Sequence, residues 1–224
     1  GQDNVVQTLK NAIKNNRLAH AYIFAGPRGV GKTSAARILA KSLNCQGVNN
    51  LNPCNKCHSC LEIDGSRSLD VIEIDGASNR GIDDIRVLRE NVKFAPAGGK
   101  FKIYIIAEVH QITPEGFNAL LKTLEEPPPY VKFIFATTHP HKIPSTIISR
   151  CQFLEFRRIS NLNIIKQLRE IASAEKIDVQ DDVLLALAKA SDGSMRDAES
   201  ILDELVSFSA KESIKRTENR QKVI

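Results

Sequence analysis

The hydrophobic residues of this 224-residue chain follow two patterns, which change near residue 160. Before that point, short apolar runs of strand length alternate with segments whose apolar residues recur at helical spacing. Buried strands that alternate with helices form a parallel sheet with helices on both faces. The sequence therefore predicts a five-stranded α/β domain, with strands at 21–25, 69–74, 102–106, 132–136 and 152–156.

Helical spacing accounts for most of the segments between these strands. The clearest start is Thr113 followed by Pro114, a cap residue before a proline in the first turn. This helix should end before Pro127, which cannot continue it. The predicted helices of this part are 1–17, the segment from the glycine loop to about 44, 61–64, 82–92, 114–126 and a short one before 149.

Beyond Ile159 only helical patterns remain, at 162–174, 182–190 and 194–208. A polar, basic tail begins at Ser209 and is expected either to fray or to continue toward a further segment. The change of pattern predicts two domains: an α/β domain over 1–159 and a small three-helix domain over 160–224.

Composition narrows the class of protein without deciding its function. No apolar run approaches the roughly 20 residues of a membrane span, so we expect a soluble chain without membrane contact. Lysine and arginine number 31 against 26 acidic residues, a net charge of +5. An excess of this size permits contact with nucleic acid but does not demand it.

The strongest chemical signal is the sequence Gly-Pro-Arg-Gly-Val-Gly-Lys-Thr at 26–33, placed between a strand and a helix. Glycines let backbone N–H groups approach a polyphosphate, and the helix start adds unpaired N–H donors. Lys32 would neutralise phosphate and the Thr33 hydroxyl would bind Mg²⁺. A chance glycine turn is the alternative. The predicted nucleotide-binding residues are Gly26, Pro27, Arg28, Gly29, Val30, Gly31, Lys32, Thr33 and Ser34.

A second signal is the group Cys45, Cys54, Cys57 and Cys60. Cys-x-x-Cys turns place two thiolates on one edge of a tetrahedral metal, and four thiolates close a structural Zn²⁺ site. Unliganded cysteines are the alternative, and His58 could replace one thiolate. A zinc-dependent DNA-binding module is a further reading, but Lys56 is the sole lysine or arginine of 45–60.

Polar residues follow two of the predicted strands. Glu108 comes after the third strand, where such a residue orients an attacking water, and Thr138 comes after the fourth. The acid expected just before Glu108, which helps to hold Mg²⁺, is replaced by Ala107.

Together these residues resemble the AAA+ ATPases and, among them, the bacterial DNA polymerase III clamp loaders. The four cysteines between the loop helix and the second strand are specific to few AAA+ proteins, and the intact phosphate loop favours the gamma/tau type over the delta-prime type. Other matching segments are Glu108-Val109-His110, Thr137-Thr138, Ser149-Arg150-Cys151 and 193–197.

The resemblance implies roles for several residues. Lys32, Glu108 and Thr138 would be catalytic, Arg196 would report on the γ-phosphate from the lid, and Arg150 would act as an arginine finger on a neighbouring subunit. The implied cofactors are ATP, Mg²⁺ and structural Zn²⁺. The implied partners are the delta and delta-prime subunits, further gamma/tau copies, the sliding clamp and primed DNA, in the bacterial cytoplasm near the nucleoid.

The resemblance also implies a clamp-loader motor, driven by ATP binding and hydrolysis. Because Ala107 removes an acid, the alternative is a nucleotide-binding scaffold that does not hydrolyse ATP. The family carries a collar domain beyond the lid. The chain begins at Gly1 and ends where the lid should end, so we expect a fragment without a collar that is monomeric or weakly associated.

Overall fold

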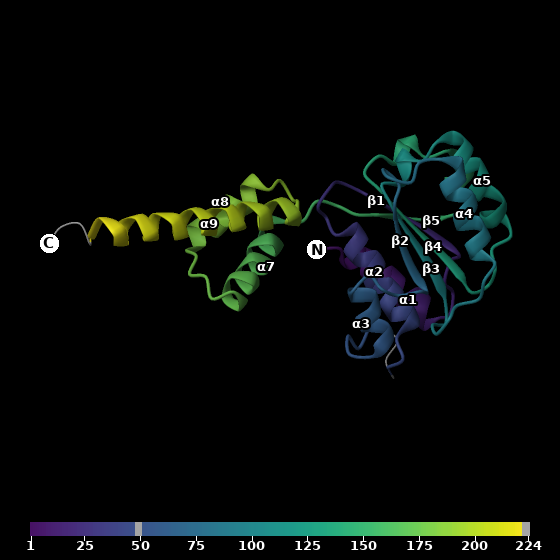
Figure 1. The fold of residues 1–224 in the computed structure, drawn as a ribbon, viewed down its shortest axis with the longest axis horizontal. Helices are drawn as coiled ribbons and strands as arrows, with labels where there is room; N and C mark the ends of the chain where they lie inside the picture. Colours follow the sequence, from purple (N-terminus) through teal and green to yellow (C-terminus); the bar gives the residue numbers. More distant parts are fainter. Residues whose placement is uncertain (48–50, 221–224) are drawn as a thin grey trace. The chain divides into compact units, whose positions relative to one another are not determined.

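The computed structural model of the chain describes residues 1–47 and 51–220, with side chains up to 208 (Figure 1). The chain divides into two compact units. The larger unit comprises Gln2–Gly26 and Gly31–Phe156, and the smaller comprises Gly1, Pro27–Val30 and the residues from Arg157 on.

The larger unit is built on a five-stranded parallel sheet with the strand order β2-β3-β4-β1-β5. β1 is buried at all five positions and β4 at all seven, as expected for strands covered on both faces. The predicted parallel sheet is confirmed. The strands are β1 (Ala21–Ala25), β2 (Val71–Asp75), β3 (Lys102–Ala107), β4 (Val131–Thr137) and β5 (Gln152–Glu155).

One face of the sheet is covered by α4 (Ile82–Val92) and α5 (Pro114–Glu125), which Figure 1 shows side by side. Ile85 of α4 and Phe117 of α5 join the core that includes Tyr104 and Phe133 of the sheet. The short α6 (Ser145–Ile148) contributes to the same core. Thr113 caps α5 as predicted, because its hydroxyl accepts the Gly116 N–H at 3.2 Å.

The opposite face lies on the side of α1 (Asp3–Lys14) and α2 (Lys32–Asn44) (Figure 1). The strand residues that alternate with the first set, such as Tyr22 and Ile105, are buried here. α3 (His58–Asp64) packs on α2, and the turns η1 (Val109–Gln111) and η2 (Pro140–Lys142) follow β3 and β4.

The smaller unit holds three helices around a core of its own, formed by residues such as Ile164, Leu187 and Leu202. Ser160 caps the first of them, accepting the Asn163 N–H at 3.4 Å. The helices are α7 (Asn161–Ala174), α8 (Asp181–Ala190) and α9 (Met195–Arg220).

Three predicted helices have wrong boundaries. α1 spans Asp3–Lys14 rather than 1–17, and Asn16, just beyond its end, has a left-handed φ of 51°. α9 continues to Arg220 rather than ending at Phe208, because the segment after Phe208 contains neither glycine nor proline and is rich in Lys, Glu and Arg. α3 begins at His58, before Cys60, because the Cys57 turn leads directly into a helix. Among the described helices, none has the length and apolar character to cross a membrane.

Candidate nucleotide site and metal centre

The predicted phosphate loop is a glycine-dependent turn between β1 and α2. Gly29 and Gly31 have φ angles of 74° and 93°, in the left-handed region that glycine tolerates best. A Cβ atom at Gly26 would collide with the Phe156 carbonyl oxygen. All three glycines are therefore required by the backbone path, which makes a chance match to the motif a poor explanation.

Lys32 is the first residue of α2, and its ammonium group curls back over the loop. Nζ donates to the Gly26 carbonyl oxygen at 2.8 Å, and the residue is only 7% exposed. Thr33 and Ser34 follow in the same first turn, where backbone N–H groups have no partner within the helix. The loop thus combines a cation with the N–H donors of a helix start, the chemistry that suits a polyphosphate and its Mg²⁺.

The middle of the loop belongs to the smaller unit. The Met195 N–H donates to the Gly29 carbonyl oxygen at 2.9 Å, and a Cβ at Gly29 would collide with the Ser194 hydroxyl. Arg196, the predicted lid arginine, is the next residue of α9. Within this unit, the loop and the start of α9 are therefore in contact.

Glu108 and Thr138 meet at the carboxyl edge of the sheet. β3 and β4 are neighbours, and the Thr138 hydroxyl donates to Glu108 Oε2 at 2.9 Å. β4 also pairs with β1, and the Gly26 N–H donates to the Thr137 carbonyl oxygen at 3.2 Å. The sheet therefore places both predicted catalytic side chains at the edge from which the phosphate loop leaves.

The residue before Glu108 offers no ligand, because Ala107 carries only a methyl group. Its register partner on β2 is Asp75. The Asp75 carboxylate holds its own turn, accepting the Ala77 N–H and the Ser78 hydroxyl, each at 3.0 Å. Asp75 of β2 is therefore engaged in its own turn and does not replace the carboxylate that is missing at Ala107.

Sequence reasoning assigned no role to two histidines beside Glu108. His110 Nδ1 lies 3.3 Å from Glu108 Oε2 and 3.1 Å from Thr137 Oγ1. His139 Nδ1 lies 2.8 Å from Thr138 Oγ1, and the two imidazole rings are 4.6 Å apart. Burial lowers the pKa of His110, an effect that the nearby Glu108 carboxylate partly opposes. The sequence shows only that each histidine follows a predicted strand, and the neighbouring positions of β3 and β4 come from the structure.

Arg150 does not join this group. It follows α6 and precedes the first residue of β5, at the amino edge of the sheet, whereas the phosphate loop leaves the carboxyl edge. Its guanidinium donates to Glu125 Oε1 and to the Thr146 carbonyl oxygen, both at 2.7 Å. A strand of this length spans about 15 Å, so Arg150 is out of reach of the loop in its own chain.

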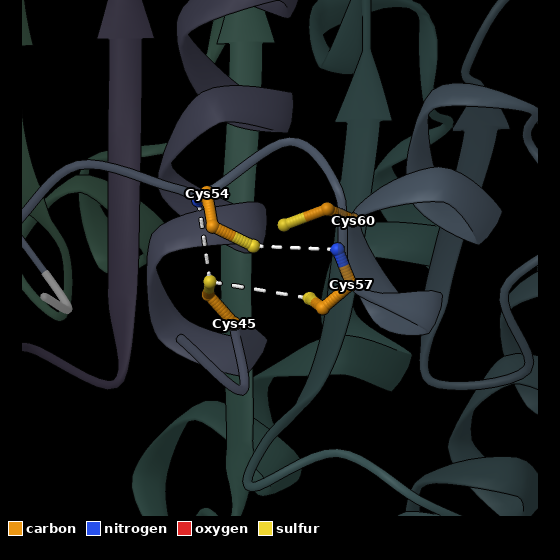
Figure 2. A group of neighbouring side chains, drawn as sticks. All are labelled: Cys45, Cys54, Cys57 and Cys60. Carbon is orange, nitrogen blue, oxygen red and sulfur yellow. Dashed lines mark hydrogen bonds between the residues drawn. The ribbon is translucent and has the colours of Figure 1, made fainter. Parts of the chain in front are cut away.

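The four predicted zinc ligands converge between α2 and α3 (Figure 2). Their sulfur atoms all lie within 4.8 Å of one another, close to the ~3.8 Å expected between thiolates around one Zn²⁺. The Gly47 and Cys54 N–H groups donate to Cys45 Sγ, and the Cys57 N–H donates to Cys54 Sγ, each at 3.3 Å. The cluster therefore fits a closed structural metal site.

Electrostatics supports the same reading of the cysteines. Backbone N–H groups of Lys56 and Cys57 lower the pKa of Cys54 to about 6, which favours the thiolate that binds metal. Burial raises the pKa of Cys60 to about 12, so this thiol needs the ion to lose its proton. His58 lies outside the cluster, with its ring 3.4 Å from Glu62 Oε2 and its side chain 80% exposed.

Family models cover both units. A model described as the delta subunit of DNA polymerase III matches residues 1–160. A second, described as the ATPase lid domain of the DNA polymerase III clamp-loader subunit, matches residues 163–211. The resemblance drawn from the motifs is thereby confirmed.

Curated relatives agree with these matches. The tau subunit of DNA polymerase III from Bacillus subtilis is 52% identical over 93% of this chain and 37% of its own length. The tau subunit from Escherichia coli is 48% identical over 92% of this chain and 32% of its own length. The chain thus spans about a third of the length of these relatives.

Solved structures establish the fold. The Holliday junction branch migration motor RuvB of Thermotoga maritima aligns with a TM-score of 0.65 at 21% identity, over 88% of this chain and 59% of that one. A variant of the same protein aligns over the same shares of the two chains with a TM-score of 0.66. At this identity the likeness confirms the predicted AAA+ architecture and carries no argument about function.

Proposed function

Because the chain belongs to the family of DNA polymerase III clamp-loader subunits, we propose that it is an ATP-driven subunit of a sliding-clamp loader. The observation that carries the proposal is the phosphate loop, in which required glycines and the curled Lys32 ammonium form one cradle. Its partners would be the delta and delta-prime subunits, further gamma/tau copies, the clamp and primed DNA.

Each site residue has a physical task in this proposal. The loop N–H groups and Lys32 would bind the phosphates. Thr33 would hold Mg²⁺, which when bound would neutralise negative charge on the phosphates. Glu108 orients the attacking water, and Thr138 fixes the Glu108 carboxylate through the 2.9 Å hydrogen bond. Arg196, which follows the loop contact at Met195, senses the γ-phosphate.

Arg150 is proposed to act on ATP bound by a neighbouring subunit. Its place at the amino edge of the sheet supports this, since its own loop lies at the other edge. A guanidinium that enters the site of another subunit stabilises transition-state charge only when the subunits are assembled. Hydrolysis would thereby be coupled to assembly on the clamp and DNA.

The alternative is a subunit that binds ATP, assembles and does not hydrolyse it. Ala107 favours this reading, because a methyl group cannot hydrogen-bond a water on Mg²⁺, and Asp75 is engaged in its own turn. Loss of such an outer partner costs about 10–100-fold in metal affinity or activity. Nucleotide binding depends on the loop and should persist under either reading.

ATP turnover with partner subunits, clamp and primed DNA separates the two candidates. We would measure it for the unaltered chain and for Ala107→Asp. The motor predicts turnover above background in the unaltered chain and a rise of about 10–100-fold in the Asp variant. Background turnover of the unaltered chain would support the scaffold, whether or not the Asp variant gains activity. Nucleotide affinity measured in parallel shows whether the substitution has disturbed the loop.

A further inference from the structure

Four side chains and one backbone N–H form a connected network around Glu108 Oε2. We propose that His110 and His139 are positioning residues, which hold the Glu108 carboxylate by donating from Nδ1, directly from His110 and through Thr138 from His139. The inference deepens the proposed function, because it rests on Glu108 as the residue that orients water. It adds two residues to the site and fixes where each imidazole carries its proton.

The Thr138 hydroxyl determines the tautomer of His139. A hydroxyl has one proton, and Thr138 gives it to Glu108 Oε2 at 2.9 Å, because an ionised carboxylate can only accept. His139 Nδ1 lies 2.8 Å from the same hydroxyl oxygen, so it must be the donor in that contact. His139 therefore carries its proton on Nδ1 and turns the Thr138 hydroxyl proton toward Glu108.

His110 is constrained by two oxygen atoms. Its Nδ1 faces Glu108 Oε2 at 3.3 Å and Thr137 Oγ1 at 3.1 Å. Without a proton, Nδ1 would direct a lone pair at the carboxylate, which is repulsive. With a proton it donates to Thr137 Oγ1 and turns the positive end of its N–H bond toward Glu108 Oε2. The side chain is only 7% exposed, so water does not readily replace these contacts.

Thr137 connects the two histidines through the backbone. Its hydroxyl oxygen accepts the His139 N–H at 3.0 Å as well as facing His110. The rings of His110 and His139 lie 4.6 Å apart, and the ring of His141 lies 5.7 Å from that of His139. The groups that surround His110 electrostatically are Glu108, His139, His141 and Lys142. Burial and the neighbours other than Glu108 lower the pKa of His110, which favours its neutral imidazole, for which the choice of tautomer matters.

The backbone explains why Glu108 needs such support. Its φ and ψ are 47° and 43°, a left-handed conformation that is unfavourable for a non-glycine residue. Its side chain is 37% exposed, so packing alone does not fix its rotamer. The hydrogen bond from Thr138 and the close approach of the His110 ring therefore determine the direction of the carboxylate.

An acidic residue at 139 would change the direction of hydrogen bonding at the Thr138 hydroxyl. Aspartate can only accept, so it would compete with Glu108 for the Thr138 hydroxyl proton. Asparagine offers an amide N–H near the position of the imidazole Nδ1 and would keep the donor. His139→Asn and His139→Asp therefore form a pair of similar size that differs in charge and in the ability to donate to Thr138 Oγ1.

The first test is spectroscopic and does not depend on turnover. Nitrogen-15 NMR of the histidine side chains in the full chain assigns each tautomer. We expect His110 and His139 with the proton on Nδ1, and Thr138→Ala should shift the His139 signals while leaving those of exposed His58 unchanged. A proton on Nε2 of His139 in the unaltered chain would overturn the inference.

The second test is kinetic, with ATP, partner subunits, clamp and DNA, in both the unaltered and the Ala107→Asp chains. His139→Ala and His139→Asp should lower kcat about 10–100-fold with little change in KM, and His139→Asn should retain most of the rate. Full kcat in His139→Ala, while Glu108→Gln loses it, would refute the positioning role and leave the proposed function intact. Full turnover in Glu108→Gln would overturn both.

Discussion

At the scale of single residues, Asp70 shows how one side chain can hold a loop. It is 7% exposed, and its carboxylate accepts the Ala97, Gly98 and Gly99 N–H groups at 2.6, 2.8 and 2.6 Å. These three donors lie between α4 and β3 and converge on one buried carboxylate. The carboxylate therefore sets the path of the chain into β3, the strand that ends beside Glu108.

Asp70→Asn should destabilise the α/β unit by about 2–3 kcal/mol, because the amide puts a donor where an acceptor is required and deprives at least one N–H group of its partner. Urea unfolding measures this loss. Asp83→Asn is the control, since the Asp83 side chain is 87% exposed and should contribute less than about 1 kcal/mol. Equal unfolding free energies for the two variants would contradict this account of Asp70.

At this scale, the sequence predicted the site residues that lie in one continuous segment of the chain. Lys32 and the three glycines were predicted because loop, strand and helix are continuous in the chain. The contacts of His110 and His139 were not, because they join the ends of β3 and β4, and the sequence does not state which strands are neighbours. The left-handed backbone conformation of Glu108 was likewise not predicted from the sequence.

At the scale of elements, the cysteine cluster is anchored to the sheet by α2. Lys41 of α2 is 9% exposed, and its ammonium contacts the Asp64 carboxylate of α3 and Asn55 Oδ1, both at 2.8 Å. Cys45 follows the last residue of α2, at the opposite end of the helix from Lys32. The metal centre and the phosphate loop are thus separated by the whole of α2, about 20 Å.

Removal of zinc should therefore unfold residues 45 to 64 and leave nucleotide affinity within about threefold, because the loop end of α2 keeps its packing. Hydrogen exchange reports on the segment, and titration with a fluorescent ATP analogue reports on the site. Return of Zn²⁺ should restore protection. A tenfold or greater loss of nucleotide affinity on chelation would show that the cluster does more than stabilise its own segment.

The predicted elements agree with the structure where hydrophobic pattern and chain breakers coincide. β1 and α5 are bounded by the glycine loop and by Thr113 and Pro127. The end of α9 was predicted wrongly because its apolar stripe stops at Phe208 while helix-forming residues continue. The hydrophobic pattern indicates which part of a helix packs against the core. The intrinsic helix propensity of the residues determines how far the helix extends.

At the scale of the whole molecule, the predicted site residues lie at opposite edges of the sheet. The phosphate loop, Glu108 and Thr138 lie at the carboxyl edge, and Arg150 lies at the amino edge. Sequence alone identified Arg150 only through the family resemblance. The fold adds support for the proposed action on a neighbour, because Arg150 lies at the amino edge of the sheet and its own loop lies at the carboxyl edge.

Arg150→Ala should leave the affinity of the chain for its own nucleotide unchanged and should lower ATP turnover of the assembled complex about 10³-fold or more. Titration of the isolated chain and turnover of the complex measure the two effects. Arg169→Ala is the control, because it also removes an ion pair of an exposed arginine, with Asp181 at 2.6 Å. Weaker binding by the isolated Arg150→Ala chain would contradict a role in trans.

The central claim is that the loop after β1 binds a triphosphate with the Lys32 ammonium as its cation. The most direct measurement is equilibrium titration of a fluorescent ATP analogue against the unaltered chain and Lys32→Ala, with folding of both checked by urea unfolding. The account predicts saturable binding by the unaltered chain and binding by the folded variant that is weaker by about a hundredfold, the loss expected for a charged hydrogen-bond donor. Equal affinity of the two proteins would contradict it.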